Sequence, residues 1–100
     1  MYNKYITLLW KVIKNMNQSD LITLITQWQQ TDPTIYKSNI KALCHLKGIK
    51  PRHLESTLNI SYSMAKSIVN PSHKARIEFL MALILAEYLQ CDVKDFLKNI

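Results

Sequence analysis

The sequence predicts an all-α protein that folds as one compact domain. Apolar residues recur at intervals of three and four through most of the chain, which is the spacing of amphipathic helices rather than of strands. Nearly half of the residues (48%) are apolar and only one is glycine, so the chain can bury a core and does not resemble a disordered protein. There is no repeat, low-complexity tract or hairpin signal. A chain of 100 residues seldom divides into two cores.

The first third of the chain, residues 1–36, contains two stretches with helical spacing. The first stretch has a broad apolar face made of Ile6, Leu9, Trp10, Ile13 and Met16. The second stretch, residues 21–30, has helical rather than alternating spacing at Leu21, Leu24, Ile25 and Trp28. Either Ser19 or Asp20 is suited to cap the second helix.

The third helix is bounded by start and stop signals. Asp32 is a suitable N-cap, and Pro33 fits the first turn, where its missing N–H costs nothing. The helix is expected to run through residues 35–47 and to stop at Gly48, because glycine suits the left-handed position after a helix end.

Two short helices are expected next, separated by a turn. Pro51 marks the start of the first, residues 51–58. Asn59 follows, and asparagine tolerates the left-handed conformation nearly as well as glycine. Ser61 is expected to cap the second short helix, residues 61–69.

The last quarter of the chain predicts one buried helix and one terminal helix. Residues 77–89 are apolar nearly all round, which is typical of a central buried helix. Asp92 is expected to cap a final helix over residues 93–100, with Asp95 reinforcing its start.

The positive charge of the chain is concentrated in its middle. The net charge is +6, and residues 37–76 alone hold eight Lys or Arg against one acid, Glu55. From Ser56 to Ile77 there is no acid at all. Such a region attracts polyanions through long-range fields and counterion release. An ordinary lysine-rich surface would give the same totals, so charge alone does not decide between the two interpretations.

The two short helices and their turn have the organisation of a helix-turn-helix, whose second helix enters the DNA major groove. That groove is about 12 Å wide and admits one slim helix without acids at its front. In residues 61–69, Met64, Ala65 and Ile68 can face inward. The outer face, which can hydrogen-bond base edges or phosphates, carries Tyr62, Ser63, Lys66 and Ser67. Basic residues suited to clamp phosphates flank the pair at Lys50, Arg52, Lys74 and Arg76.

Residues 40–97 resemble the Cro/CI-type (XRE family) helix-turn-helix domain of phage repressors and small bacterial regulators. "LNIS" stands at the place of the usual L-G-[IV]-S turn, and Asn70 matches the asparagine that commonly ends the third helix of the family. "LAEYLQCDVKDFL" is similar to the closing pattern. The resemblance implies a lambda-repressor-like bundle over residues 37–100. Residues 1–36 lie outside the resemblance, and their helical spacing predicts a two-helix extension.

The resemblance also implies a function and a site. The protein would be a transcriptional regulator, a repressor that binds a double-stranded DNA operator as a homodimer; a cytoplasmic location is expected separately, from the two unpaired cysteines. Tyr62, Ser63 and Ser67 occupy base-reading positions, and Lys66 could read a base or clamp a phosphate. The phosphate contacts would come from Lys50, Arg52, Ser61, Lys74 and Arg76.

Three features depart from the family pattern. Pro51 replaces a polar residue that donates to phosphate, Glu55 replaces a small residue between the two helices, and the loop after Asn70 is longer. Residues 1–36 could complete the core, form a dimer surface or bind a partner protein, and the small size of the chain favours the core. These features leave an alternative open: a protein-binding antirepressor, or a phage-encoded inhibitor of a bacterial defence nuclease.

Other chemistry has little support in the sequence, and we expect no enzyme activity, cofactor or metal. The tight spacing of a structural zinc site is missing among Cys44, His45, His53, His73 and Cys91. With a single glycine there is no glycine-rich phosphate loop. The two cysteines fit a reducing cytosol. The longest apolar run, residues 79–86, is far short of the roughly 20 residues of a membrane span, so no membrane partner is expected.

Overall fold

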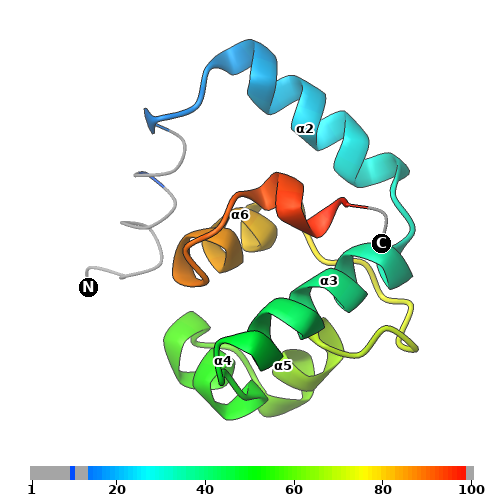
Figure 1. Cartoon of the computed structure of the whole chain (residues 1–100), viewed down its shortest axis with the longest axis vertical. Helices are drawn as coiled ribbons and strands as arrows, with labels where there is room; N and C mark the ends of the chain where they lie inside the picture. The colour runs from blue at the N-terminus through cyan, green and yellow to red at the C-terminus, as the bar shows by residue number, and fades with distance from the viewer. Residues whose placement is uncertain (1–9, 11–13, 99–100) are drawn as a thin grey trace.

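The computed structural model describes Trp10 and residues 14–98, and all regular structure within them is helical (Figure 1). The all-α prediction is therefore confirmed. The predicted first helix, from Ile6 to Met16, falls largely on residues 1–9 and 11–13, which lie outside the described residues. In chain order the elements are α2 (Gln18–Gln30), α3 (Pro33–Leu46), α4 (Pro51–Leu58), α5 (Tyr62–Ile68), α6 (Phe79–Tyr88) and the 3-10 helix η1 (Val93–Phe96).

Helix α2 begins earlier than predicted, and its cap is a different residue. Asn17 is the N-cap, and its Oδ1 accepts the backbone N–H groups of Ser19 at 2.9 Å and Asp20 at 3.3 Å. The prediction of Ser19 or Asp20 as the cap was wrong. All three side chains can cap a helix, and the extended backbone of Asn17 (φ −78°, ψ 146°) decides which one does.

The boundaries of α3, α4 and α5 follow the predicted signals. The Asp32 side chain accepts the Thr34 N–H at 2.8 Å, with Pro33 at the first position of α3. Gly48 (φ +68°) and Asn59 (φ +55°) both adopt the left-handed conformation after their helices. Ser61 caps α5, since its Oγ accepts the N–H of Met64 at 3.1 Å. These local predictions are confirmed.

Helix α6 is the central buried helix, as predicted, and Figure 1 shows it between the other elements. Every side chain from Ala82 to Ala86 is buried. The helix starts at Phe79 rather than at Ile77, because both backbone groups of Ile77 have other partners. Its N–H donates to the Tyr36 hydroxyl at 2.9 Å, and its carbonyl accepts the indole N–H of Trp28 at 2.7 Å.

The C-terminal segment is shorter and more tightly wound than the predicted helix over residues 93–100. Asp92 and Asp95 form the expected reciprocal cap, but the helix is the 3-10 helix η1 and ends at Phe96. The carbonyl groups of Phe96 and Lys98 both accept hydrogen bonds from the Asn39 amide, at 2.7 Å each. Those carbonyls therefore turn toward α3, and the predicted extent was wrong.

Helix α2 belongs to the same core as the rest of the described chain. Its Leu24 and Trp28 are both 2% exposed. The Trp28 ring stacks on Tyr36 at 4.0 Å between centroids and meets Phe79 and Phe96 edge-on. The radius of gyration of 12.9 Å is close to the value of about 13 Å for a compact domain of 100 residues. Among the described helices, none is long and apolar enough to cross a membrane.

Candidate functional site

Helices α4 and α5 are joined by the three residues Asn59–Ser61 and pack against each other. The packed faces bury Leu54 and Leu58 of α4 and Ala65 and Ile68 of α5. Packing therefore leaves the opposite side of α5 to solvent. That side exposes Tyr62, Ser63 and Lys66, which are three of the four side chains predicted to read bases. Met64, predicted to face inward, is 47% exposed and lines a groove beside α5, so that prediction was wrong.

Two cations lie close to the Tyr62 ring. The guanidinium carbon of Arg52, from α4, is 4.9 Å from the Tyr62 ring centroid, and the Lys66 Nζ is 5.6 Å from it. Each such cation–π contact stabilises an exposed arrangement by about 0.5–1 kcal/mol. We call Arg52, Tyr62 and Lys66 the Tyr62 cluster. It brings together two residues predicted to face bases and one predicted to bind phosphate.

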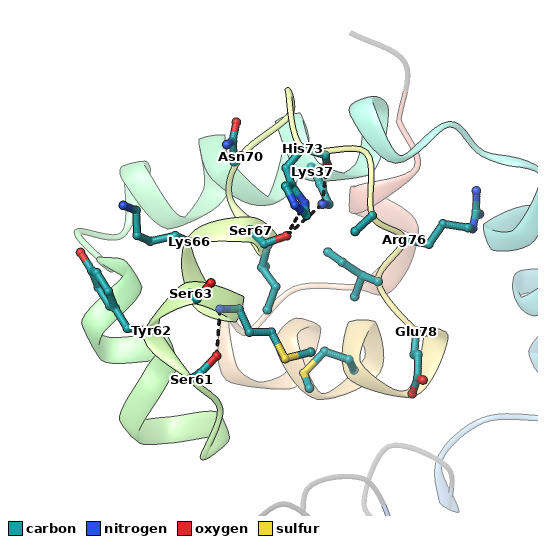
Figure 2. Close-up of a pocket in the computed structure, with 15 residues that line it drawn as sticks. Lys37, Ser61, Tyr62, Ser63, Lys66, Ser67, Asn70, His73, Arg76 and Glu78 are labelled. Atoms are coloured by element: carbon teal, nitrogen blue, oxygen red, sulfur yellow. Dashed lines mark hydrogen bonds between the residues drawn. The ribbon is translucent and has the colours of Figure 1, made fainter.

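Ser67, the fourth predicted base reader, has its hydroxyl in contact with other protein groups. Its Oγ is 2.7 Å from Nδ1 of His73 and 3.4 Å from Nζ of Lys37, and the residue is only partly exposed. Figure 2 shows Lys37, Ser67 and His73 converging, while Tyr62 and Lys66 lie on the outer side of α5. We call these three residues the Lys37 network.

Lys37 is a functional candidate that the sequence analysis missed. It is 0% exposed, and its ammonium group donates to the backbone carbonyl of His73 at 2.6 Å. Burial lowers the pKa of Lys37 below its ordinary value. A signal was available, because Lys37 shares the i, i+3, i+7 face of its helix with the apolar residues Ile40 and Cys44. A lysine within an apolar stripe is a candidate for a buried cation.

The Lys37 network lies at a groove of about 680 Å³ beside α5. One wall is α5, and the other is formed by residues 70–78 and the start of α6 (Figure 2). The groove has apolar residues in its lining, namely Met64, Ile68, Ala75, Ile77 and Met81. Its other lining residues include the cations Lys37, Lys66 and Arg76 and one acid, Glu78.

Arg76, predicted to bind phosphate, holds the end of α2. Its Nη2 donates to the carbonyl oxygens of Trp28, Gln29 and Thr31, at 2.7, 3.1 and 3.2 Å. The last carbonyl groups of a helix have no partner within the helix, and a cation there also interacts favourably with the helix dipole. Arg76 is thus a C-terminal cap of α2.

The remaining predicted phosphate ligands are exposed around α4 and α5. Lys50 precedes α4, and its backbone N–H donates to Nδ1 of His53 at 2.9 Å. Lys74 is exposed in the loop after α5. Ser61 is exposed, but its Oγ already accepts the hydrogen bond that caps α5.

The described residues offer little for metal or nucleophilic chemistry. They contain no group of three His, Cys, Asp or Glu side chains placed to hold a metal ion. Cys44 and Cys91 are free thiols, and burial raises the pKa of each to about 11. In the described part of the chain no carboxylate hydrogen-bonds to His73, so the Ser67–His73 pair lacks the third member of a triad.

No protein-family model, curated protein or solved structure matches this chain.

Proposed function

We propose that this protein is a sequence-specific double-stranded DNA-binding regulator, with α4, the Asn59–Ser61 turn and α5 acting as a helix-turn-helix. Helix α5 would lie in the major groove. The observation that carries the proposal is the outer face of α5, where Tyr62, Ser63 and Lys66 are exposed in a stretch without acids from Ser56 to Ile77. Such a face meets no like-charge repulsion from the phosphates on either side of the groove.

The proposed roles differ among the exposed residues. Tyr62, Ser63 and Lys66 reach base edges, since they occupy the outer face of the entering helix. Arg52 orients Tyr62 through its cation–π contact and binds phosphate at the groove edge. Lys50, Lys74 and Ser61 contact phosphates on the flanks. Arg76 acts indirectly: its hydrogen bond to the end of α2 fixes the position of the loop that contains Lys74.

We further propose the lambda-repressor-like arrangement of the XRE family, a homodimer and a cytoplasmic repressor role. Two copies would place their α5 helices in successive major grooves, about 34 Å apart. The apolar residues exposed on the described surface include Ile22, Leu46 and Leu80, at 58%, 80% and 50% exposure. Burial of one of these in a second copy would stabilise such a dimer. The proposal includes no catalytic step.

A fluorescence-anisotropy titration on genomic operator fragments at two salt concentrations tests the proposal. We expect tight binding to one fragment and an affinity that falls steeply with salt, since each phosphate contact releases counterions. Replacing Lys66 with Met should weaken this binding, and Lys94→Met, on η1, provides a control of equal charge. Absent or salt-insensitive binding would exclude the DNA-binding function.

A protein partner is the second candidate, and the composition of the groove favours it. Met64, Met81 and Ile77 contribute apolar side chains to the lining of the groove beside α5. An acidic protein segment with apolar side chains would fit this groove, as an antirepressor or nuclease-inhibitor function would need. Replacing Met64 with Ser separates the two functions: it should weaken a protein complex strongly and DNA binding little.

A further inference from the structure

Lys37 carries a buried charge that no acid among the described residues neutralises. The residue is 0% exposed, and its ammonium group contacts only the neutral oxygens of His73 and Ser67. No carboxylate in the described residues lies within ion-pair distance of it; by contrast, exposed Lys98 pairs with Asp95 at 2.8 Å. Burying an ion is costly unless an opposite charge compensates it. The position of Lys37 therefore favours an anion that comes from outside the chain.

The hydrogen-bonding capacity of Lys37 is also incompletely used. Asn39, the other buried polar residue of α3, uses both amide hydrogens on backbone carbonyls and has a structural role. A lysine ammonium has three N–H donors, and the described contacts of Lys37 use two. The third N–H therefore has no acceptor among the described residues.

The surroundings of Lys37 fit a tetrahedral oxyanion. The Ser67 hydroxyl, the His73 ring and Asn70 line the same groove and supply groups that can donate hydrogen bonds. Lys66 adds a second positive charge on the same helix as Ser67. Glu78 is the only acid in the groove lining, and Figure 2 shows it at the far end from Lys37.

We propose that Lys37, Ser67 and His73 form a phosphate-binding site, and that one phosphodiester of the DNA backbone occupies it in the complex. The backbone strand would run along the groove beside α5 while Tyr62 and Lys66 face the bases. Ser67 would rotate its hydroxyl from His73 to the phosphate, and this movement would uncover the buried Lys37 ammonium, whose third N–H would donate to the same group. The DNA source of the phosphate rests on the proposed function, whereas the site itself can be tested without DNA.

An NMR titration of the full chain with inorganic phosphate, against chloride at equal pH and ionic strength, tests the site. We expect saturable shifts at the Lys37 ammonium and at the amides of Ser67 and His73, with Lys94 unaffected. Shifts that never saturate, or that appear equally with chloride, would overturn the phosphate site. This measurement uses the wild-type chain, so it does not depend on how a variant folds.

The salt dependence of DNA binding distinguishes backbone phosphate from free phosphate. Loss of one phosphate contact should lower the slope of log affinity against log salt by about 0.9 in Lys37→Met, with no change in Lys94→Met. An unchanged slope in Lys37→Met, with DNA binding retained, would overturn occupation by the DNA backbone. If the wild-type chain binds no DNA but phosphate saturates the site, the proposed function fails and the site is one for free phosphate.

Discussion

Single residues on α5 and in the loop that follows it have different physical roles, although the sequence presents them as parts of one surface. Tyr62 is held by two cations and remains 38% exposed, so its hydroxyl is presented in a restricted orientation. Ser67 has its hydroxyl directed to His73, and Arg76 has its guanidinium directed to α2. A reduction in DNA binding would therefore have different causes at these three positions.

Tyr62 offers a test of direct base recognition. Tyr62→Phe keeps the ring close to Arg52 and Lys66 and removes only the hydroxyl, whereas Tyr62→Ala removes both the ring and the hydroxyl. We expect Tyr62→Phe to lose about 1–3 kcal/mol of discrimination at one operator position, with little change in non-specific binding. Anisotropy titrations on operators with single base changes measure this. If Tyr62→Phe lowered the affinity equally for all operator sequences, the hydroxyl would contribute to DNA binding without recognising a particular base.

Arg76 and Lys74 form a matched pair for separating stability from binding. Arg76→Ala removes the cap of α2 and should lower the free energy of unfolding by about 1–2 kcal/mol. Lys74→Ala removes the same charge from an exposed position and should change the free energy of unfolding by less than about 0.5 kcal/mol. It should lower the binding affinity for all DNA sequences alike. Urea unfolding and anisotropy on both variants distinguish these effects. A stable Arg76→Ala protein would show that the cap is dispensable.

The lowered pKa of Lys37 predicts a pH dependence. The unfolded chain holds this proton more tightly than the folded chain, so the free energy of unfolding should rise with pH between the folded pKa and about 10.5. Lys37→Met lacks this contribution. The difference in stability, wild type minus variant, should therefore increase as pH rises toward 10, as measured by urea unfolding. A constant difference would mean that burial does not perturb this ammonium group.

At the scale of elements, the turn between α4 and α5 sets how the two helices meet. Asn59 adopts φ +55° and ψ 49°, and the N–H of Ile60 returns to the Glu55 carbonyl at 3.2 Å. Ser61 then starts α5 by capping it. Glu55 is partly exposed, and the helices pack with it in place, so this departure from the family pattern does not prevent their contact.

The left-handed turn residue can be tested with two substitutions. Asn59→Ala places a Cβ without a compensating polar group in a left-handed conformation, which should cost about 1 kcal/mol of folding stability. Asn59→Gly keeps that conformation accessible and should be nearly neutral. Thermal unfolding of both variants measures the difference. Equal stability of the two variants would indicate that the turn can adopt another conformation.

At the scale of the whole molecule, one core joins the ends of the described chain. Trp28 of α2 stacks on Tyr36, meets Phe96 of η1 and hydrogen-bonds to Ile77 before α6. Leu24 is buried in the same cluster. The segment predicted as an extension therefore contributes, through α2, to the core that supports α4 and α5.

Trp28 should accordingly be among the residues most important for stability. Trp28→Ala should cost about 3–5 kcal/mol, as for other large aromatic residues in cores. Trp28→Phe keeps most of the apolar contact but leaves the Ile77 carbonyl without its donor, which should cost about 1–3 kcal/mol. Urea unfolding followed by circular dichroism measures both. If Trp28→Ala lowered the free energy of unfolding by less than about 1 kcal/mol, α2 would not unfold cooperatively with the rest of the described chain.

The sequence by itself determined the helical class and most helix ends, because those signals act over three or four residues. Asp32, Gly48, Asn59 and Ser61 each behave as their residue types and immediate neighbours predict. The start of α2 was misplaced because three neighbouring side chains can all cap a helix, and only the backbone conformation selects Asn17. The exposure of Tyr62, Ser63 and Lys66 also follows from helical periodicity.

Tertiary structure alone decided the contacts of the polar side chains that join segments distant in the sequence. Lys37 meets the carbonyl of His73 across 36 residues, and Arg76 meets that of Trp28 across 48. The early end of η1 likewise depends on Asn39, which lies 57 residues before Phe96. Periodicity places a side chain on a face of its helix, but its partner depends on how the helices pack. The physical reason is that a buried donor or cation takes whichever acceptor the packed chain brings within about 3 Å.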